Sequence, residues 1–252
     1  MLTRRNSDLE WAAWGEKNPY FGVLSAQEFS DPLPNDELLQ QFFASGERDI
    51  DRTFRIIGAS VKPDFQPARV LDYGCGVGRL VVPLTKRASE VVGVDVSPGM
   101  LEQARVNCRK FGAASASLLH VDEMHSLEPA SFDFVHCFIV LQHIPPKRGE
   151  LILKKLISLL ATGGVAAIHV TYGDSNPILR RGMRVLRDRV YLVHCLLNLI
   201  QRRPVFQPQM QMNTYSMNRI LRILNEELIS NLHIDFTDHG GHKGAMLYFE
   251  KL

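Results

Sequence analysis

The sequence predicts an α/β fold with a doubly wound, mostly parallel seven-stranded sheet and a C-terminal antiparallel strand. Short apolar runs alternate with segments of helical spacing from residue 66 onward, and several of these runs end in an acidic residue. A short turn joins the last two runs, so the final strand is expected to form a hairpin with the one before it. The seven expected strands are 70–72, 91–95, 118–122, 131–137, 165–171, 232–236 and 245–249.

A glycine-rich turn follows the first expected strand. Asp72 ends the apolar run, and glycines at 74, 76 and 78 precede a segment with helical spacing. Glycine adopts positive φ without a Cβ clash and lets the backbone come close to a ligand. The first amides of a following helix suit an anionic group such as a carboxylate or phosphate. A tight turn without any ligand is the alternative interpretation.

The spacing of these glycines distinguishes two classes of nucleotide-binding protein. A dinucleotide fingerprint would need its third glycine at position 79, which is Arg79. The observed pattern D-x-G-x-G-x-G resembles the first motif of class I S-adenosylmethionine-dependent methyltransferases. Asp95, 23 residues after Asp72, and then Asp122 end the next two expected strands, as in that family. Residues 66–173 carry the resemblance, and a nicotinamide-dependent dehydrogenase is the lesser alternative.

The resemblance implies S-adenosylmethionine (SAM) as cofactor and S-adenosylhomocysteine (SAH) as product. Asp72 would accept from the methionyl ammonium, the glycine turn would meet the carboxylate, and Asp95 would bind the ribose hydroxyls. The family pattern gives Asp122 to the adenine amino group, with Glu123 and Met124 beside the ring. The predicted cofactor-binding residues are Asp72, Gly74, Cys75, Gly76, Gly78, Asp95, Val96, Met100, Asp122, Glu123, Met124 and Phe138.

A loop after the fourth expected strand supplies the candidate catalytic residue. Parallel strands place their carboxyl ends at one edge of the sheet, so His143 is expected near the cofactor. An imidazole can accept a proton near neutral pH, which makes His143 a candidate general base. The alternative is that this histidine only holds the loop. Methyl transfer can also proceed without a base, because alignment of the reacting atoms supplies much of the rate.

Residues 1–65 precede the expected sheet and are interpreted as an N-terminal helical cover. Trp11, Trp14, Tyr20 and Phe21 are large aromatic side chains that need burial. They fit either an outer helix fixed to the domain or a lid over the cofactor. The string that begins at Trp14 also resembles the opening of bacterial methyltransferases of unassigned substrate. Residues 36–57 are expected to form one or two helices, with a break at 45–47.

Residues 66–252 are expected to form the SAM-binding domain, and residues 174–213 an insertion between its fifth and sixth strands. The insertion is interpreted as a helical cap over the substrate or a contact with a second subunit. Its segment 180–203 also allows contact with a membrane surface. The insertion also carries several arginines, and an anionic substrate would follow if they face the cleft. They are Arg180, Arg181, Arg184, Arg187 and Arg189. The candidate substrate-binding residues are Trp14, Tyr20, Phe21, Gln142, Tyr172, His239 and His242.

Bulk properties narrow the class of protein further. A net charge of +2 makes nucleic acid an unlikely partner, since such proteins need a clustered basic surface. The four cysteines lack C-x-x-C spacing, which predicts neither a disulfide framework nor a metal site. The N-terminus lacks the apolar core of a signal peptide, and a cytoplasmic location is expected. No apolar run reaches the roughly 18 residues of a membrane span, and the sequence carries no signal for oligomeric state.

The sequence therefore predicts a SAM-dependent methyltransferase that acts on an oxygen or nitrogen atom of a small molecule. A SAM-binding protein without transferase activity, used as a sensor or assembly partner, is the first alternative. A nucleic-acid methyltransferase is a more distant one.

Overall fold

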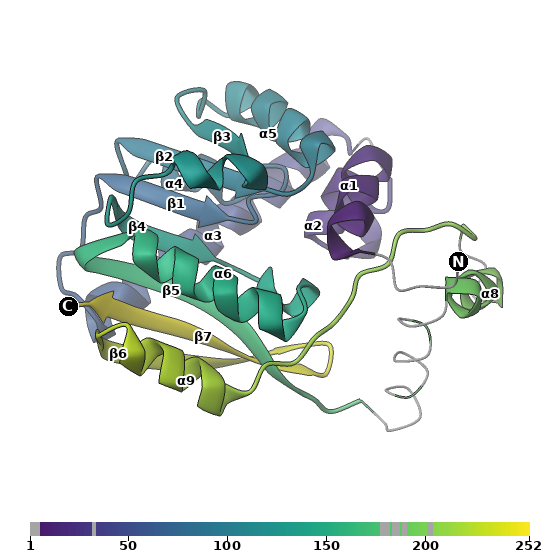
Figure 1. The fold of residues 1–252 in the computed structure, drawn as a ribbon. Helices are drawn as coiled ribbons and strands as arrows, with labels where there is room; N and C mark the ends of the chain where they lie inside the picture. Colours follow the sequence, from purple (N-terminus) through teal and green to yellow (C-terminus); the bar gives the residue numbers. More distant parts are fainter. Residues whose placement is uncertain (1–5, 32–33, 177–181, 183–186, 188–190, 201–203) are drawn as a thin grey trace.

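The computed structural model describes residues 6–31, 34–176, 182, 187, 191–200 and 204–252. A seven-stranded sheet lies at its centre, in the order β3-β2-β1-β4-β5-β7-β6 (Figure 1). β7 is antiparallel to both of its neighbours, and the pairs formed among β1 to β5 are parallel. This arrangement confirms the predicted fold class. The strands are β1 Arg69–Tyr73, β2 Glu90–Asp95, β3 Ser117–His120, β4 Phe132–Cys137, β5 Leu160–Asp174, β6 Ile229–His239 and β7 His242–Lys251.

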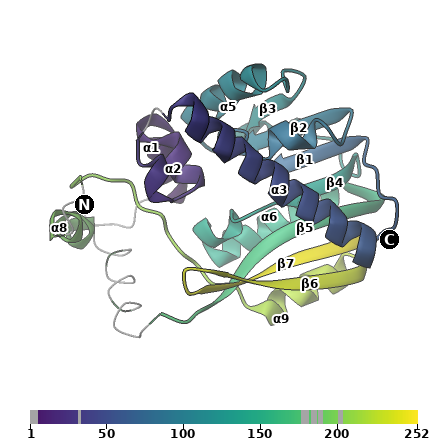
Figure 2. The ribbon, with the colours of Figure 1, turned by 180° about the vertical axis from the view of Figure 1, so that it is seen from behind.

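Helices cover both faces of the sheet. α3 crosses one face (Figure 2), and α6 and α9 lie on the opposite face (Figure 1). β1 alternates between the two layers, because Val70 belongs to the core on the α3 side and Leu71 to the core on the α6 side. The α-helices are α1 Ser7–Lys17, α2 Pro19–Val23, α3 Asp36–Ser60, α4 Val81–Leu84, α5 Pro98–Lys110, α6 Pro146–Leu159, α8 Tyr191–Ile200 and α9 Met217–Glu226. The 3-10 helices are η1 Gln27–Phe29, η2 Val121–Ser126 and η3 Leu141–His143.

α3 is one continuous helix of 25 residues, so the predicted break at 45–47 was wrong. Gly46 lies inside this helix. A Cβ at that position would come within 2.3 Å of the carbonyl oxygen of Arg79. The glycine therefore permits a close approach between α3 and the loop after β1, and it does not end a helix.

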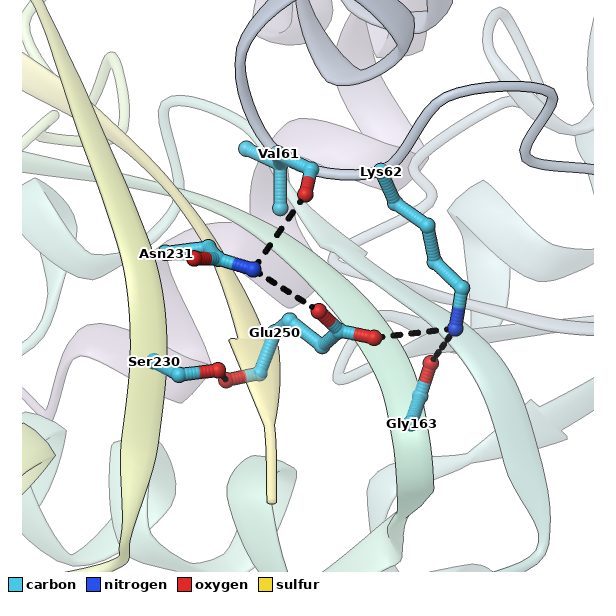
Figure 3. Close-up of polar contacts among 6 residues, drawn as sticks. All are labelled: Val61, Lys62, Gly163, Ser230, Asn231 and Glu250. Carbon is cyan, nitrogen blue, oxygen red and sulfur yellow. Dashed lines mark hydrogen bonds and ion pairs between the residues drawn. The ribbon is translucent and has the colours of Figure 1, made fainter.

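The C-terminal end of α3 is attached to the sheet by polar contacts (Figure 3). Lys62 Nζ donates to the carbonyl oxygen of Gly163 and pairs with Glu250 Oε1 at 2.9 Å. Asn231 Nδ2 donates to the other oxygen of Glu250 at 3.0 Å. These contacts lie where β5 begins, at the edge of the sheet opposite the carboxyl ends of its parallel strands. They fix α3 against β5, β6 and β7.

β3 ends at His120, two residues before the predicted strand end at Asp122. The His120 side chain accepts from the Asp122 amide at 3.3 Å, and the Glu123 carboxylate accepts from the His120 amide at 2.8 Å. This reciprocal pair is a capping box, which starts a helix. The chain consequently turns into η2, and Asp122 lies in its first turn.

The insertion and the N-terminal helices contact each other beside the sheet. We call residues 204–213 the return segment, since they lead from α8 back towards α9. Glu10 Oε2 of α1 accepts from the Gln209 amide at 2.8 Å, and Lys17 Nζ donates to the Phe206 carbonyl at 2.8 Å. The division of the chain at residue 65 and the cap function of 174–213 stay predictions.

The described part of the insertion includes α8 and Arg187. Arg187 donates from Nε to His194 Nδ1 at 2.8 Å, within the insertion itself. The other arginines singled out from the sequence, Arg180, Arg181, Arg184 and Arg189, lie outside the described residues. α8 exposes Leu192, Leu196, Leu199 and Ile200. Among the helices of the described segments, none combines the length and apolar character that crossing a bilayer requires.

Candidate functional site

The glycine-rich loop after β1 owes its shape to positive φ and close neighbours. Gly74, Gly76 and Gly78 have φ values of 78°, 53° and 84°. A Cβ on Gly74 would lie 2.2 Å from a methyl group of Val140, and one on Gly76 would lie 2.6 Å from a methyl group of Val23. Glycine is therefore required both by the backbone conformation and by the packing of two other segments onto the loop.

Backbone hydrogen bonds attach this loop to the end of β2. The amides of Gly74 and Cys75 both donate to the Val94 carbonyl, at 2.7 and 3.0 Å. The Gly76 amide donates to Asp95 Oδ2 at 2.9 Å. The amides expected to bind a ligand carboxylate thus have partners within the protein, and their hydrogen bonds bring Asp95 beside the loop.

Asp95 and Asp72 stand at adjacent strand ends in different surroundings. Asp95 Oδ1 accepts from the Ser97 amide at 2.9 Å, and burial raises the pKa of its carboxyl against the lowering effect of its backbone hydrogen bonds. Asp72 is 2% exposed, and its Oδ1 accepts from His136 Nδ1 at 2.9 Å. Its buried Oδ2 finds no hydrogen-bond partner among the described residues. Asp72 therefore retains an acceptor for a ligand donor.

Arg79, the residue after the last loop glycine, offers the complementary group. Its Nη1 pairs with Asp49 Oδ2 at 2.6 Å and donates to Ser45 Oγ at 3.2 Å, so α3 holds the guanidinium in place. Its buried Nε has no hydrogen-bond partner in the part of the chain that the structure describes. Buried polar groups normally have partners. An acceptor on Asp72 and a donor on Arg79, both on one cavity, fit the ammonium and carboxylate of an α-amino acid.

A cavity of about 410 Å³ lies at the carboxyl ends of β1, β2 and β4, under α1 and the return segment. It brings together many of the residues that the sequence singled out. Those that line it are Asp72, Gly74, Cys75, Gly76, Asp95, Val96, Met100, Phe138, Gln142, His143 and His239. Those that do not are Gly78, Asp122, Glu123, Met124, Trp14, Tyr20, Phe21, Tyr172 and His242.

Local structure explains why some predicted residues lie elsewhere. The Asp122 side chain is 86% exposed, and its neighbour Val121 lines the cavity instead. Tyr20 is buried against α5, where its hydroxyl donates to Asn107 Oδ1 at 2.9 Å. Tyr172 lies against Phe236 of β6. These positions give Tyr20 and Tyr172 packing contacts outside the cavity.

α1 contributes cavity residues that the sequence did not single out for this role. Asp8 and Trp11 line the cavity, as does Arg148 from the first turn of α6. Asp8 Oδ1 accepts from Arg148 Nη1 at 2.7 Å, and the Trp11 ring lies edge-on to His143 with centroids 4.8 Å apart. The two partners in each pair are far apart in the sequence, so no local spacing could have indicated them.

His143 is buried, and both of its ring nitrogens have partners. Nδ1 lies 2.8 Å from the Gln211 carbonyl oxygen, and Nε2 lies 3.2 Å from the amide nitrogen of Gln142. Thr171 donates to the amide oxygen of Gln142 at 2.8 Å, which directs the amide N–H groups of Gln142 towards His143. This pattern assigns the proton to Nδ1 and the lone pair to Nε2. Burial lowers the pKa of His143 to about 4, so the ring is neutral at neutral pH.

The loop that carries His143 begins with a strained residue. Ile139 has φ 58°, a left-handed conformation that β-branched residues rarely adopt. It lines the cavity between Phe138 and Val140. Such strain persists only where surrounding packing fixes it, and it concentrates at functional sites.

Histidines also surround Phe138. His239 lines the cavity, and its ring lies 5.3 Å from that of His169 between centroids. Burial lowers the pKa of both imidazoles. Within the ranges that the structure describes, no three histidine, cysteine or acidic side chains are grouped to hold a metal ion. His239 therefore contributes a neutral side chain to the cavity wall at neutral pH.

The sheet order, the glycine loop after β1 and the acid at the end of β2 define the fold of class I methyltransferases. Residues 70–164 match the family model described as "Methyltransferase domain". The chain therefore has the fold of class I methyltransferases, and this part of it is similar to a methyltransferase domain.

Two known proteins are similar to part of the chain. The chain is 31% identical over 111 residues to a ubiquinone biosynthesis O-methyltransferase of Xanthomonas euvesicatoria, covering 44% of this chain and 46% of that protein. It thus spans about half the length of that relative. It is also 32% identical over 136 residues to the 23S rRNA uracil C(5)-methyltransferase RlmD of Burkholderia thailandensis, covering 50% of this chain and 26% of that protein.

Magnesium protoporphyrin IX methyltransferase from Synechocystis PCC 6803 has a similar fold. Its structure with bound SAM gives a TM-score of 0.62 at 16% identity and covers 98% of each chain. Its structure with bound SAH gives a TM-score of 0.58 at 20% identity and covers 90% of this chain and 92% of that one.

Proposed function

We propose that this protein uses SAM to methylate an oxygen or nitrogen atom of a small-molecule acceptor. One observation carries the proposal. Asp72, Arg79 and Asp95 line a single cavity together with the glycine loop. The unpartnered atoms of Asp72 and Arg79 suit the amino-acid end of the cofactor, and Asp95 lies where a ribose diol needs an acceptor. Phe138, Val96 and Met100 supply apolar walls.

When bound, SAM supplies an activated methyl group. Asp72, Arg79 and Asp95 would hold this cofactor, whose methyl group would go to a lone pair of the acceptor and leave SAH as product. The chain must hold the acceptor in line and exclude water. Trp11, Ile139, Val140 and Met212 are apolar residues of the cavity wall that suit this task.

An acceptor that reacts as an anion fits the state of His143 best. Nε2 already accepts from the Gln142 amide, and the ring is neutral with its proton on the nitrogen that faces Gln211. His143 thereby joins η3 to the return segment, which makes it a positioning residue in our proposal. A carboxylate or phenolate oxygen needs no base, and O-methylation is also the reaction named for the ubiquinone-pathway relative.

The test is SAH binding by titration calorimetry on matched variants. We expect the wild-type chain to bind SAH, and Asp95→Asn to weaken binding at least about tenfold, because a charged acceptor for two hydroxyls is lost. Asp122→Asn should change the affinity less than about twofold, since the Asp122 side chain is exposed outside the cavity. Equal effects of the two substitutions, or no binding at all, contradict the proposed cofactor site.

A transfer assay separates the enzyme from a SAM-binding sensor. The protein is incubated with SAM and small-molecule cell extract, and SAH release is measured. Binding without release favours the sensor. Retention of polynucleotide at low salt, together with methylation of RNA, favours a nucleic-acid methyltransferase such as RlmD.

A further inference from the structure

A second cavity adjoins the cofactor cavity. It measures about 760 Å³ and lies between the N-terminal helices and the return segment. Trp14 and Phe21 from the N-terminal helices form an aromatic part of its wall, with ring centroids 5.6 Å apart. Two residues that the sequence had suggested for substrate binding therefore line this cavity and not the first one.

The two cavities share part of their walls. Ser25, Met210 and Met212 line both of them. Ser25 Oγ donates to the Met210 sulfur at 3.3 Å, so the contact between the segment after α2 and the return segment forms part of the partition. Methionine is unbranched and adapts its shape readily. A molecule that reaches past these side chains could occupy both cavities at once.

The charged residues described in the lining of the second cavity are all cationic. Lys17 and Arg187 both line it, and none of the described residues in its lining is acidic. Lys17 Nζ donates to the Phe206 carbonyl, and Arg187 donates from Nη2 to Asn198 Oδ1 at 3.2 Å. These hydrogen bonds hold two cations at fixed positions beside an apolar wall. Such a combination selects an anion that has an apolar body.

We propose that the second cavity binds a non-reacting carboxylate of the methyl acceptor, an amphipathic organic acid with a ring or hydrocarbon body. This inference rests on the proposed function, because it takes the first cavity as the place of methyl transfer. Trp14 and Phe21 contact the apolar body, Lys17 and Arg187 bind the carboxylate, and Met210 and Met212 flank the passage to the cofactor.

The test uses 1-pyrenebutyrate as a fluorescent probe and its neutral amide as the control ligand, both with saturating SAH. The carboxylate should bind about tenfold more tightly than the amide. Lys17→Gln and Arg187→Gln should each weaken carboxylate binding about threefold and leave amide binding unchanged. Arg187→Lys retains the charge and should retain the preference for the carboxylate over the amide. Lys86→Gln and Arg105→Gln, exposed charges on other faces, should have no effect.

Equal affinity for the two probes, or a preference that survives both Gln substitutions, overturns the proposal. Weaker carboxylate binding with saturating SAH than without SAH also overturns the proposal, because the probe would then lie in the cofactor cavity. Circular dichroism shows whether each variant folds. If Arg187→Gln does not fold, the comparison of Lys17→Gln with the charge-retaining Arg187→Lys still tests the role of charge. Calorimetry with SAH on the same samples reports separately on the proposed function.

Discussion

The two sides of the first cavity, which we propose as its cofactor side and its acceptor side, are built by different means. On the cofactor side, adjacent parallel strands end together, and amides of the glycine loop donate to Val94 and Asp95 at the end of β2. On the acceptor side, α1 meets segments far away in the chain through single side-chain contacts, such as those of Asp8 with Arg148 and Glu10 with Gln209. The first side follows from the sheet itself. The second depends on individual residues and can change without altering the fold.

Gly74→Ala tests the cofactor side and should have the largest effect. The new Cβ would meet Val140 at 2.2 Å and force a residue with a side chain to adopt φ 78°. We expect a loss of about 3 kcal/mol of unfolding free energy, from left-handed strain and overpacking together. Gly112→Ala is the control, since Gly112 has φ 75° and no atom within 4 Å of its Cβ position. It should lose only about 1 kcal/mol. Urea denaturation measures both, and similar losses would refute the packing role of Gly74.

Glu10→Ala tests the acceptor side. Glu10 is 2% exposed, and removing its carboxylate leaves the Gln209 amide without this acceptor. The expected loss is about 2 kcal/mol of unfolding free energy. Glu16→Ala, an exposed position on the same helix, should cost far less. SAH affinity should stay within about twofold for both variants. A large loss of SAH affinity in Glu10→Ala would mean that the two sides are not independent.

Arg79→Met tests the proposed donor to the cofactor carboxylate. The substitution removes the buried Nε–H and should weaken SAH binding about tenfold in calorimetry. Arg69→Met is the control, because Arg69 lies at the opposite end of β1 and pairs with Glu90 at 2.9 Å. It should leave SAH affinity unchanged. An unchanged SAH affinity in Arg79→Met would mean that the loop amides, and not Arg79, bind the cofactor carboxylate.

His143→Gln should give the smallest effect, seen in the pH dependence of stability. The folded-state pKa of His143 is lowered to about 4, so the unfolded chain takes up this proton first as pH falls below about 6.5. Neutral His143 therefore contributes stability above that pH and loses it between about 6.5 and 4. Wild-type protein should lose about 1 kcal/mol between pH 7 and 5.5 that His143→Gln does not lose. His125→Gln, at an exposed position, should parallel the wild type.

The cofactor side could largely be predicted from the sequence because its signals are local. Apolar runs that end at Asp72 and Asp95, with glycines between, determine both the strand ends and the loop. Asp122 shows the limit of this reasoning. A capping box between His120 and Glu123 ended β3 early and left the Asp122 side chain exposed.

For the acceptor side, the sequence predicted an N-terminal helical cover but not the residues that line the cavity. Four aromatic residues in the first 21 positions indicated burial, but not which of them would face the cavity. Trp11 lines the first cavity and Trp14 the second, although both belong to α1. Gly46 was predicted to break a helix, yet it lies inside α3. Its close approach to the Arg79 carbonyl depends on tertiary packing, which no local pattern indicates.

The attachment of α3 to β5, β6 and β7 bears on how the chain can be shortened (Figure 3). Phe42, Ile50 and Ile57 of this helix are fully buried and form part of the core on that face of the sheet. A truncated chain that starts at residue 66 would bare this apolar layer to water, and we expect it to precipitate on expression. A chain that starts at residue 34 would keep α3 but lose Tyr20 and Phe29, whose rings pack on Phe42, so it too would expose part of this layer.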